Sequence, residues 1–299
     1  MSKKTAPASA ADEPAADGSA VDRSAADGST DAEAGRPPGR RLRAFASREL
    51  EAAIDALGWR GNRLHRGVHL ARKGLRRVRA TLALGGAALG PGAAWIDRGL
   101  RDANRDLSAL RDAQALVETL ERLLRGPGDD AHRALLRRGQ RRAASARAAA
   151  ARTVRAEDPD LAARRSLLRV LRAALRALPW ETLAAEQWRE SVALSLHRVE
   201  RARQRARRGS DEDWHEWRRR ARRLSQQQRA LQAAGLGEDA PAFDRHRTER
   251  LGEAQDLNLL LDHCGKGSPF AKPDRLALRA FARSELARSR GGIDPDSAG

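Results

Sequence analysis

The apolar residues of this chain recur mostly at three- and four-residue spacing, which is the spacing of an amphipathic α-helix. From Arg41 onward, alanine and leucine are interspersed in this way with arginine and glutamate. Turn signals, chiefly glycine and proline, divide the region into segments. The pattern predicts helices at about 42–57, 62–84, 93–125, 129–156, 160–178, 181–208, 211–234, 242–264 and 273–290. No useful length alternates with period two and β-branched residues are scarce, so we predict an all-α fold without a sheet.

The two ends of the chain lack this pattern. Residues 1–40 are rich in alanine, serine, aspartate, glycine and proline, and Val21 is their one aliphatic residue larger than alanine. Such a segment cannot bury enough apolar surface to offset the entropy of ordering. We therefore predict a disordered arm at 1–40, a helical domain at 41–290 and a disordered tail at 291–299. Long helices joined by short loops predict antiparallel bundles.

One basic pattern, His-x-x-Arg-basic-x-x-Arg-Arg, occurs twice, with its histidines 146 residues apart. The first copy comprises His69, Arg72, Lys73, Arg76 and Arg77, with Arg79 ten residues after the histidine; the second comprises His215, Arg218, Arg219, Arg222 and Arg223. At about 100° per residue, each set covers an arc of roughly 140° on its helix. The apolar residues lie elsewhere on the helix, so each copy offers one face to a core and an adjacent face to a polyanion.

Composition supports an anionic partner. The 299 residues include 58 lysines and arginines against 40 aspartates and glutamates, a formal net charge of +18. Self-repulsion of this size costs stability and suits a protein that binds an anion. Only five of the basic residues are lysine, and arginine can grip phosphate through two parallel hydrogen bonds. An arginine-biased composition is the alternative explanation for this charge. A basic helix face can also be simply solvated or paired with neighbouring carboxylates, but no acidic residue lies between Asp55 and Asp97 to pair with the first copy.

The duplication extends beyond the basic helices. Asp112 follows His69 by 43 residues and Asp256 follows His215 by 41, each in an apolar helical segment. We expect these aspartates to orient arginines rather than to act as acids or bases. The halves, at about 41–178 and 180–290, each contain a preceding helix, a basic helix, an Asp-bearing helix and a closing helix. Two similar halves would place the basic faces in related positions, lining one groove; Arg201, on the helix before the second motif, is a further candidate for its wall.

Four segments resemble the conserved-histidine α-helical domain, or CHAD, family: VHLARKGLRRVRATL (68–82), LRDAQALVETL (110–120), WHEWRRRARRL (214–224) and LGEAQDLNLLL (251–261). Their order and spacing cover essentially residues 41–290. The resemblance implies two four-helix subdomains with approximate twofold pseudo-symmetry and a basic central cavity. It also implies inorganic polyphosphate as the ligand, bound through the two histidines and the motif arginines and lysine, and localisation to polyphosphate granules. Ser225 stands where the second motif usually has a basic residue, which predicts a weaker grip in that half.

The chemistry of the motif suits a phosphate chain. Arginines at +3, +7 and +10 repeat along a helical stripe and could hold successive phosphoryl groups. Binding should follow the counterion-release behaviour of phosphate polymers. A histidine among arginines should resist protonation and accept a proton more readily once phosphate arrives. We therefore expect affinity for polyphosphate to rise as the pH falls.

Other functions have weaker support. Nucleic-acid binding rests on net charge alone, because aromatic residues are 3% with no tyrosine for base stacking. An enzyme acting on phosphate chains would need a nucleophile or a bound metal. The sequence shows neither a Walker-type loop nor a clustered carboxylate set, so we expect a non-catalytic protein without cofactors. His65 and His69 have the spacing of two metal ligands, but the surrounding arginines disfavour a cation.

The remaining expectations concern the location of the protein. One cysteine, Cys264, excludes a disulfide framework and a cysteine-based zinc site. The first residues contain no apolar segment of a secretory signal. No stretch approaches the roughly 18–20 apolar residues of a membrane span. We expect a cytoplasmic protein that is associated with polyphosphate granules.

Overall fold

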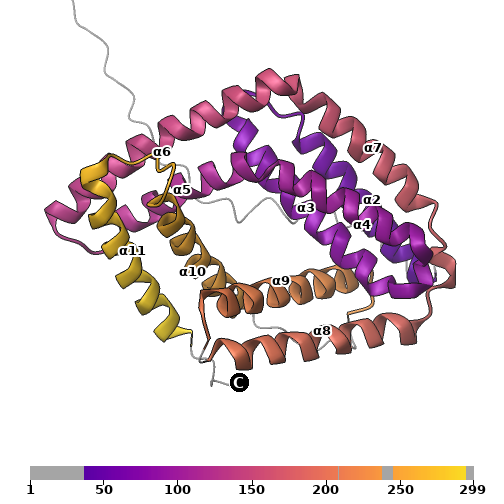
Figure 1. Cartoon of the computed structure of the whole chain (residues 1–299). Helices are drawn as coiled ribbons and strands as arrows, with labels where there is room; N and C mark the ends of the chain where they lie inside the picture. Colours follow the sequence, from indigo (N-terminus) through magenta and orange to yellow (C-terminus); the bar gives the residue numbers. More distant parts are fainter. Residues whose placement is uncertain (1–36, 208, 238–244, 294–299) are drawn as a thin grey trace, which may run out of the picture. The chain divides into compact units, whose positions relative to one another are not determined.

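The computed structural model describes residues 37–207, 209–237 and 245–293. Every regular element in these ranges is a helix, so the predicted all-α class is confirmed there. The α-helices are α2 (Pro38–Ala56), α3 (Leu64–Gly85), α4 (Gly90–Asp106), α5 (Ser108–Arg125), α6 (Asp130–Glu157), α7 (Ala162–Arg176), α8 (Ala185–Ala206), α9 (Asp211–Ala233), α10 (Arg245–His263) and α11 (Lys272–Gly292). Figure 1 shows them along the chain.

Most helix limits agree with the spacing of apolar residues to within a few positions. The segment predicted as one helix at 93–125 is an exception and was wrong, because the chain turns at Leu107 between α4 and α5. Leu107 is buried, and the hydroxyl of Ser108 donates to the carbonyl oxygen of Arg105 at this turn. Neither glycine nor proline marks the break, so the sequence carries no conventional signal for it.

The predicted arm and tail fall largely outside the described residues. Residues 1–36 and 294–299 are not described, whereas residues 38–40 form the first turn of α2 and Gly291 and Gly292 end α11. Proline at the start of α2 suits a helix because its missing N–H has no intrahelical acceptor there. At the start of α9, the carboxylate of Asp213 accepts the backbone N–H of Ser210 at 2.8 Å and so caps the helix.

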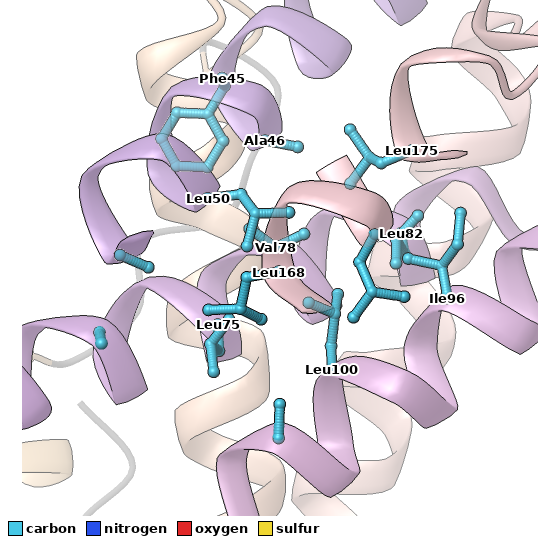
Figure 2. Packing of buried hydrophobic residues seen from close by; sticks show 14 of the residues in the cluster. Phe45, Ala46, Leu50, Leu75, Val78, Leu82, Ile96, Leu100, Leu168 and Leu175 are labelled. Carbon is cyan, nitrogen blue, oxygen red and sulfur yellow. The ribbon is translucent and has the colours of Figure 1, made fainter. Parts of the chain in front are cut away.

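The largest core surrounds the first basic helix. Leucines and other apolar residues of α2, α3, α4 and α7 interdigitate there (Figure 2). Leu50, Leu75, Leu100 and Leu175 are essentially inaccessible to solvent. Burying a leucine side chain of this kind contributes about 1.5–3 kcal/mol. This core holds α3 firmly on one side and leaves its basic side to face other helices.

Two further cores fix the second basic helix and its neighbours. One joins α5 and α6 to α10 and α11, and the other joins α8 and α9 to α10 and α11. The largest core also takes residues from α8 and α9. Helices from both of the predicted halves therefore contribute to common cores.

Close packing brings α3 against α2. Gly67 and Gly74 lie on this side of α3, and a Cβ atom at Gly74 would meet the Glu49 carbonyl oxygen at 2.9 Å. A Cβ at Gly67 would collide with the backbone of Ala56. The two glycines therefore allow an approach that alanine would prevent. On its other sides α3 packs against α4, α5, α8 and α9.

Candidate functional site

The two basic helices lie against each other. α3 and α9 are far apart in the sequence, and they pack together directly. Val68, Leu75 and Val78 turn one side of α3 into the core, and Trp217 and Leu224 do the same for α9. This orientation follows from the amphipathic pattern of each helix, because burying the apolar stripe leaves the adjacent basic stripe beside the neighbouring helix.

A cleft of about 550 Å³ lies where α3, α4 and α9 meet. We call it the arginine cleft. It is lined by Arg76, Arg79 and Ala80 of α3, Arg101 and Asn104 of α4, and Arg219, Arg220, Arg222, Arg223 and Gln226 of α9. Seven of these ten residues are arginines and none is acidic. A cleft of one sign of charge between low-dielectric walls concentrates the opposite ion.

Four partly buried arginines continue from the cleft into the protein. We call them the inner cluster: Arg72 and Arg76 of α3, and Arg218 and Arg222 of α9. Burial lowers the pKa of Arg76 to about 9, and repulsion from Arg222 and Arg72 adds to the effect. Burial, followed by repulsion from Arg222, also lowers the pKa of Arg218 to about 9. Like charges held together in this way favour the entry of an anion.

The pKa values of the other two members of the inner cluster are lowered as well. Burial is the first cause of the lowered pKa of Arg72 and of Arg222. Nη1 of Arg72 donates to the Asn104 carbonyl oxygen at 2.7 Å, which fixes this guanidinium against α4. Nε of Arg72 and Nε of Arg218 are buried and have no hydrogen-bond partner within the described ranges. These N–H groups are suitable donors for phosphate oxygens.

Two aspartates stand beside the inner cluster. Burial raises the pKa of Asp112, and the charge of Arg72 opposes that shift. Burial likewise raises the pKa of Asp256, opposed first by Arg111 and then by Arg122. The charges of Arg218 and Arg222 also act on Asp256. Both carboxylates are therefore near motif arginines, which suits the orienting role expected for them. Two carboxylates against the four guanidinium groups leave the cluster positively charged.

The two motif histidines have different surroundings. Burial, with the charge of Arg111 as the next cause, lowers the pKa of His69 to about 4. The expected resistance of His69 to protonation is therefore confirmed, with burial rather than the arginines as its first cause. Nδ1 of His215 is hydrogen-bonded to Oε1 of Gln255 on α10 at 2.8 Å. Since Oε1 only accepts, the proton in this bond is on Nδ1.

Some motif residues are paired with carboxylates of neighbouring helices. Arg77 lies away from the arginine cleft and contacts Glu49 of α2 at 2.7 Å, and both side chains are nearly buried. Arg79 lines the cleft and makes a two-pronged contact with Asp97 of α4, at 2.8 and 3.1 Å. The first copy thus obtains from α2 and α4 the carboxylates that its own helix lacks.

The remaining candidates divide between the cleft and its surroundings. Arg219 and Arg223 line the cleft, and Glu216 of the same helix pairs with Arg219. The half-buried Lys73 lies close enough to His69 for its charge to lower that pKa. Arg201 is exposed on α8 and is not among the residues that line the cleft.

The structure adds residues that sequence reasoning missed. Arg101, Asn104, Arg220 and Gln226 line the cleft. Arg220 immediately follows two motif arginines, so it could have been included, whereas Arg101 lies on a helix without any motif. Arg111 acts electrostatically on both basic helices. Its one sequence signal is its place in LRDAQALVETL, directly before Asp112.

The described part of the chain offers neither a metal site nor a membrane span. No group of three or more histidine, cysteine, aspartate or glutamate residues there is placed to hold a metal ion. No helix within the same ranges combines the length and the apolar character needed to cross a membrane.

Comparison with known proteins identifies the family. The chain matches the CHAD domain over residues 32–265. It belongs to the CHAD-domain family. The resemblance seen in the four sequence segments is thereby confirmed, and the match includes both motif helices, α3 and α9. CHAD domains are associated with polyphosphate binding and are generally binding domains rather than catalytic ones. No curated protein and no solved structure matches the chain.

Proposed function

We propose that this CHAD-domain protein binds inorganic polyphosphate, without catalysis, in the arginine cleft and inner cluster between α3 and α9. The observation that carries the proposal is the lining of the cleft, seven arginines and no acidic residue. Arg79, Arg219 and Arg220 are paired with carboxylates just outside that lining, and the other four are not paired in this way within the described residues. Polyphosphate repeats a negative charge at every phosphoryl group, so one chain can contact many guanidinium groups at once. The binding residues would be those of the two motifs that face this region, joined by Arg101.

The burial of the guanidinium groups in the inner cluster favours an anion as the ligand of this region. The lowered pKa values of Arg76 and Arg218 indicate that folding alone brings these charges together at a cost. Sites that store unfavourable electrostatics are commonly functional sites. Phosphate would supply the missing opposite charge and accept from Nε of Arg72 and Nε of Arg218.

The proposal includes an internal duplication with approximate twofold pseudo-symmetry. Its support is the recurrence of one arrangement: a motif helix whose inner arginines face an aspartate 43 or 41 residues after the histidine. In the first copy Arg72 faces Asp112, and in the second copy Arg218 and Arg222 face Asp256. Two such units would give a polymer contacts on both sides of the cleft. Association with polyphosphate granules in the cytoplasm would follow from this binding.

Calorimetric titration of the full chain tests the proposal. Long-chain polyphosphate and duplex DNA would be compared at about 0.15 M salt, where surface charges are partly screened. Polyphosphate should bind more tightly than DNA, and the double variant Arg72→Ala/Arg218→Ala should lose most of the affinity. The double variant His69→Ala/His215→Ala should also bind more weakly. Equal binding of both polymers, unaffected by these substitutions, would contradict the proposal and leave net charge as the explanation.

A further inference from the structure

Arg111 lies on a third helix that carries neither basic motif. It is in the first turns of α5, and α5 packs against α3, α6 and α10. Only 20% of its side chain is exposed. Nη1 of Arg111 donates to Oε2 of Glu118 at 2.7 Å, two turns further along the same helix. Its position is therefore fixed by an internal carboxylate.

The charge of Arg111 reaches the charged groups of four helices. It lowers the pKa of Arg72 and Arg76 on α3 and of Arg222 on α9. It also acts on Asp112 of its own helix and on Asp256 of α10. Electrostatic interaction falls off with distance inside a protein, so Arg111 lies in the neighbourhood of these groups, and the packing of α5 on α3 and α10 agrees with this. The charge of Arg111 thus acts on members of the inner cluster from both basic helices.

Glu118 is the group that neutralises Arg111. Its other oxygen, Oε1, accepts from Nε2 of Gln114 at 3.0 Å, and Oε1 of Gln114 accepts from Nη1 of Arg147 on α6 at 3.0 Å. Nearly half of the Glu118 side chain is exposed, 47%. The carboxylate of Glu118 therefore keeps contact with water and can be rehydrated when another anion takes its place. Another anion can therefore replace this carboxylate at small cost.

We propose, on the basis of the proposed function, that Arg111 is a further phosphate-binding residue and that Glu118 is the carboxylate that phosphate replaces. A phosphoryl group presents two oxygens in a geometry similar to that of a carboxylate. The guanidinium group of arginine can donate two parallel hydrogen bonds to either group. A phosphate held by Arg111 would lie beside Arg72 and Arg222 and so connect the two basic helices. Before phosphate binds, Glu118 limits the unbalanced charge at this point.

The second half has no equivalent of this arginine. Gln255 directly precedes Asp256 as Arg111 directly precedes Asp112, and Gln255 is hydrogen-bonded to His215. The two halves therefore contribute unequally. Arg111 is a single central contact rather than one of a pair, and its loss is not compensated by the other half.

Two substitutions with opposite expected effects test the inference. Arg111→Gln should weaken polyphosphate binding by about tenfold or more, because a charge-assisted contact is lost. It should also reduce the salt dependence by about one phosphate contact. Glu118→Gln should strengthen binding about threefold, because the amide competes less well than the carboxylate for Arg111. Both would be measured by titration with polyphosphate, after circular dichroism and urea unfolding have established that each variant folds.

Matched controls separate this role from a general effect of net charge. Arg169→Gln on α7 and Glu190→Gln on α8 make the same charge changes at exposed positions. Larger effects at 111 and 118 than at 169 and 190 support the inference. If the wild type binds polyphosphate and Arg111→Gln behaves like Arg169→Gln, Arg111 does not bind phosphate. The same conclusion follows if Glu118→Gln weakens binding. Failure of the wild type to bind polyphosphate would instead overturn the proposed function itself.

Discussion

The charge of Arg76 should cost the folded protein stability at neutral pH. Burial, followed by repulsion from Arg222 and Arg72, lowers its pKa well below the ordinary value, to about 9. A shift in this direction means that folding disfavours the charged form, by an energy on the order of a few kcal/mol. Below pH 9 the guanidinium is protonated in both the folded and the unfolded chain, so the cost is present in full. It diminishes only as the pH rises above about 9 towards the ordinary pKa of arginine, because there the unfolded chain binds more protons than the folded chain.

The variant Arg76→Met removes this charge and keeps an apolar stem of similar length. Replacing buried charged groups by apolar residues of similar volume stabilises proteins by about 1–4 kcal/mol. We expect the free energy of unfolding of this variant to rise by about 2 kcal/mol. The same variant should bind polyphosphate about tenfold more weakly, because it lacks one charge-assisted contact. Stability and binding would therefore change in opposite directions, as expected where a site is strained for function.

Urea unfolding followed by circular dichroism measures the first effect. The midpoint should move to higher urea concentration at constant slope, by about 0.7 M if the slope is about 3 kcal/mol/M. Titration with polyphosphate measures the second effect. Arg169→Met on the exposed face of α7 is the control and should change neither quantity appreciably. A fall in stability of Arg76→Met, or unchanged polyphosphate binding, would refute the reasoning that this buried charge is kept for an anion.

Three further predictions concern the neighbouring groups. Arg77→Met should destabilise the fold by about 3 kcal/mol in urea unfolding, because it leaves the nearly buried Glu49 carboxylate unpaired; polyphosphate affinity should hardly change, and loss of affinity without loss of stability would contradict this. The pKa of His69 is about 4, and a bound phosphate should raise it, so affinity for polyphosphate should increase as the pH falls from 7 to 5. His69→Ala should flatten that pH profile in titrations, and an unchanged slope would exclude His69 as its source. Gln255→Ala should weaken binding about fivefold, as expected for one hydrogen bond of about 1 kcal/mol to His215; titration finding unchanged affinity would show that this hydrogen bond does not orient His215 for binding.

The helical fold was predictable because burial of an apolar stripe determines each helix. The spacing of apolar residues gave α3 and α9 within about two residues. The turn at Leu107 was missed because a buried leucine, rather than glycine or proline, occupies it. The spacing of apolar residues identifies the buried face of a helix. A turn that is held by tertiary packing has no such signal in the sequence.

The candidate site was predictable only in part, for a related reason. Arg76 and Arg77 are adjacent in the motif, yet about 100° around the helix separates them. Arg76 faces the arginine cleft and Arg77 faces Glu49 of α2. The motif cannot distinguish them, because the difference depends on which helix packs on each side. Arg101 lines the cleft from α4, and Arg111 acts on the motif arginines from α5. The placement of α4 and α5 beside α3 follows from packing rather than from any local pattern.

The structure of the protein in complex with polyphosphate of defined length tests the central claim most directly. The account predicts a phosphate chain in the arginine cleft between α3 and α9, in contact with Arg76, Arg101, Arg222 and Arg223. The chain should extend towards Arg72 and Arg218 of the inner cluster. A chain bound on the exposed faces of α6 or α7, with the arginine cleft unoccupied, would contradict the account.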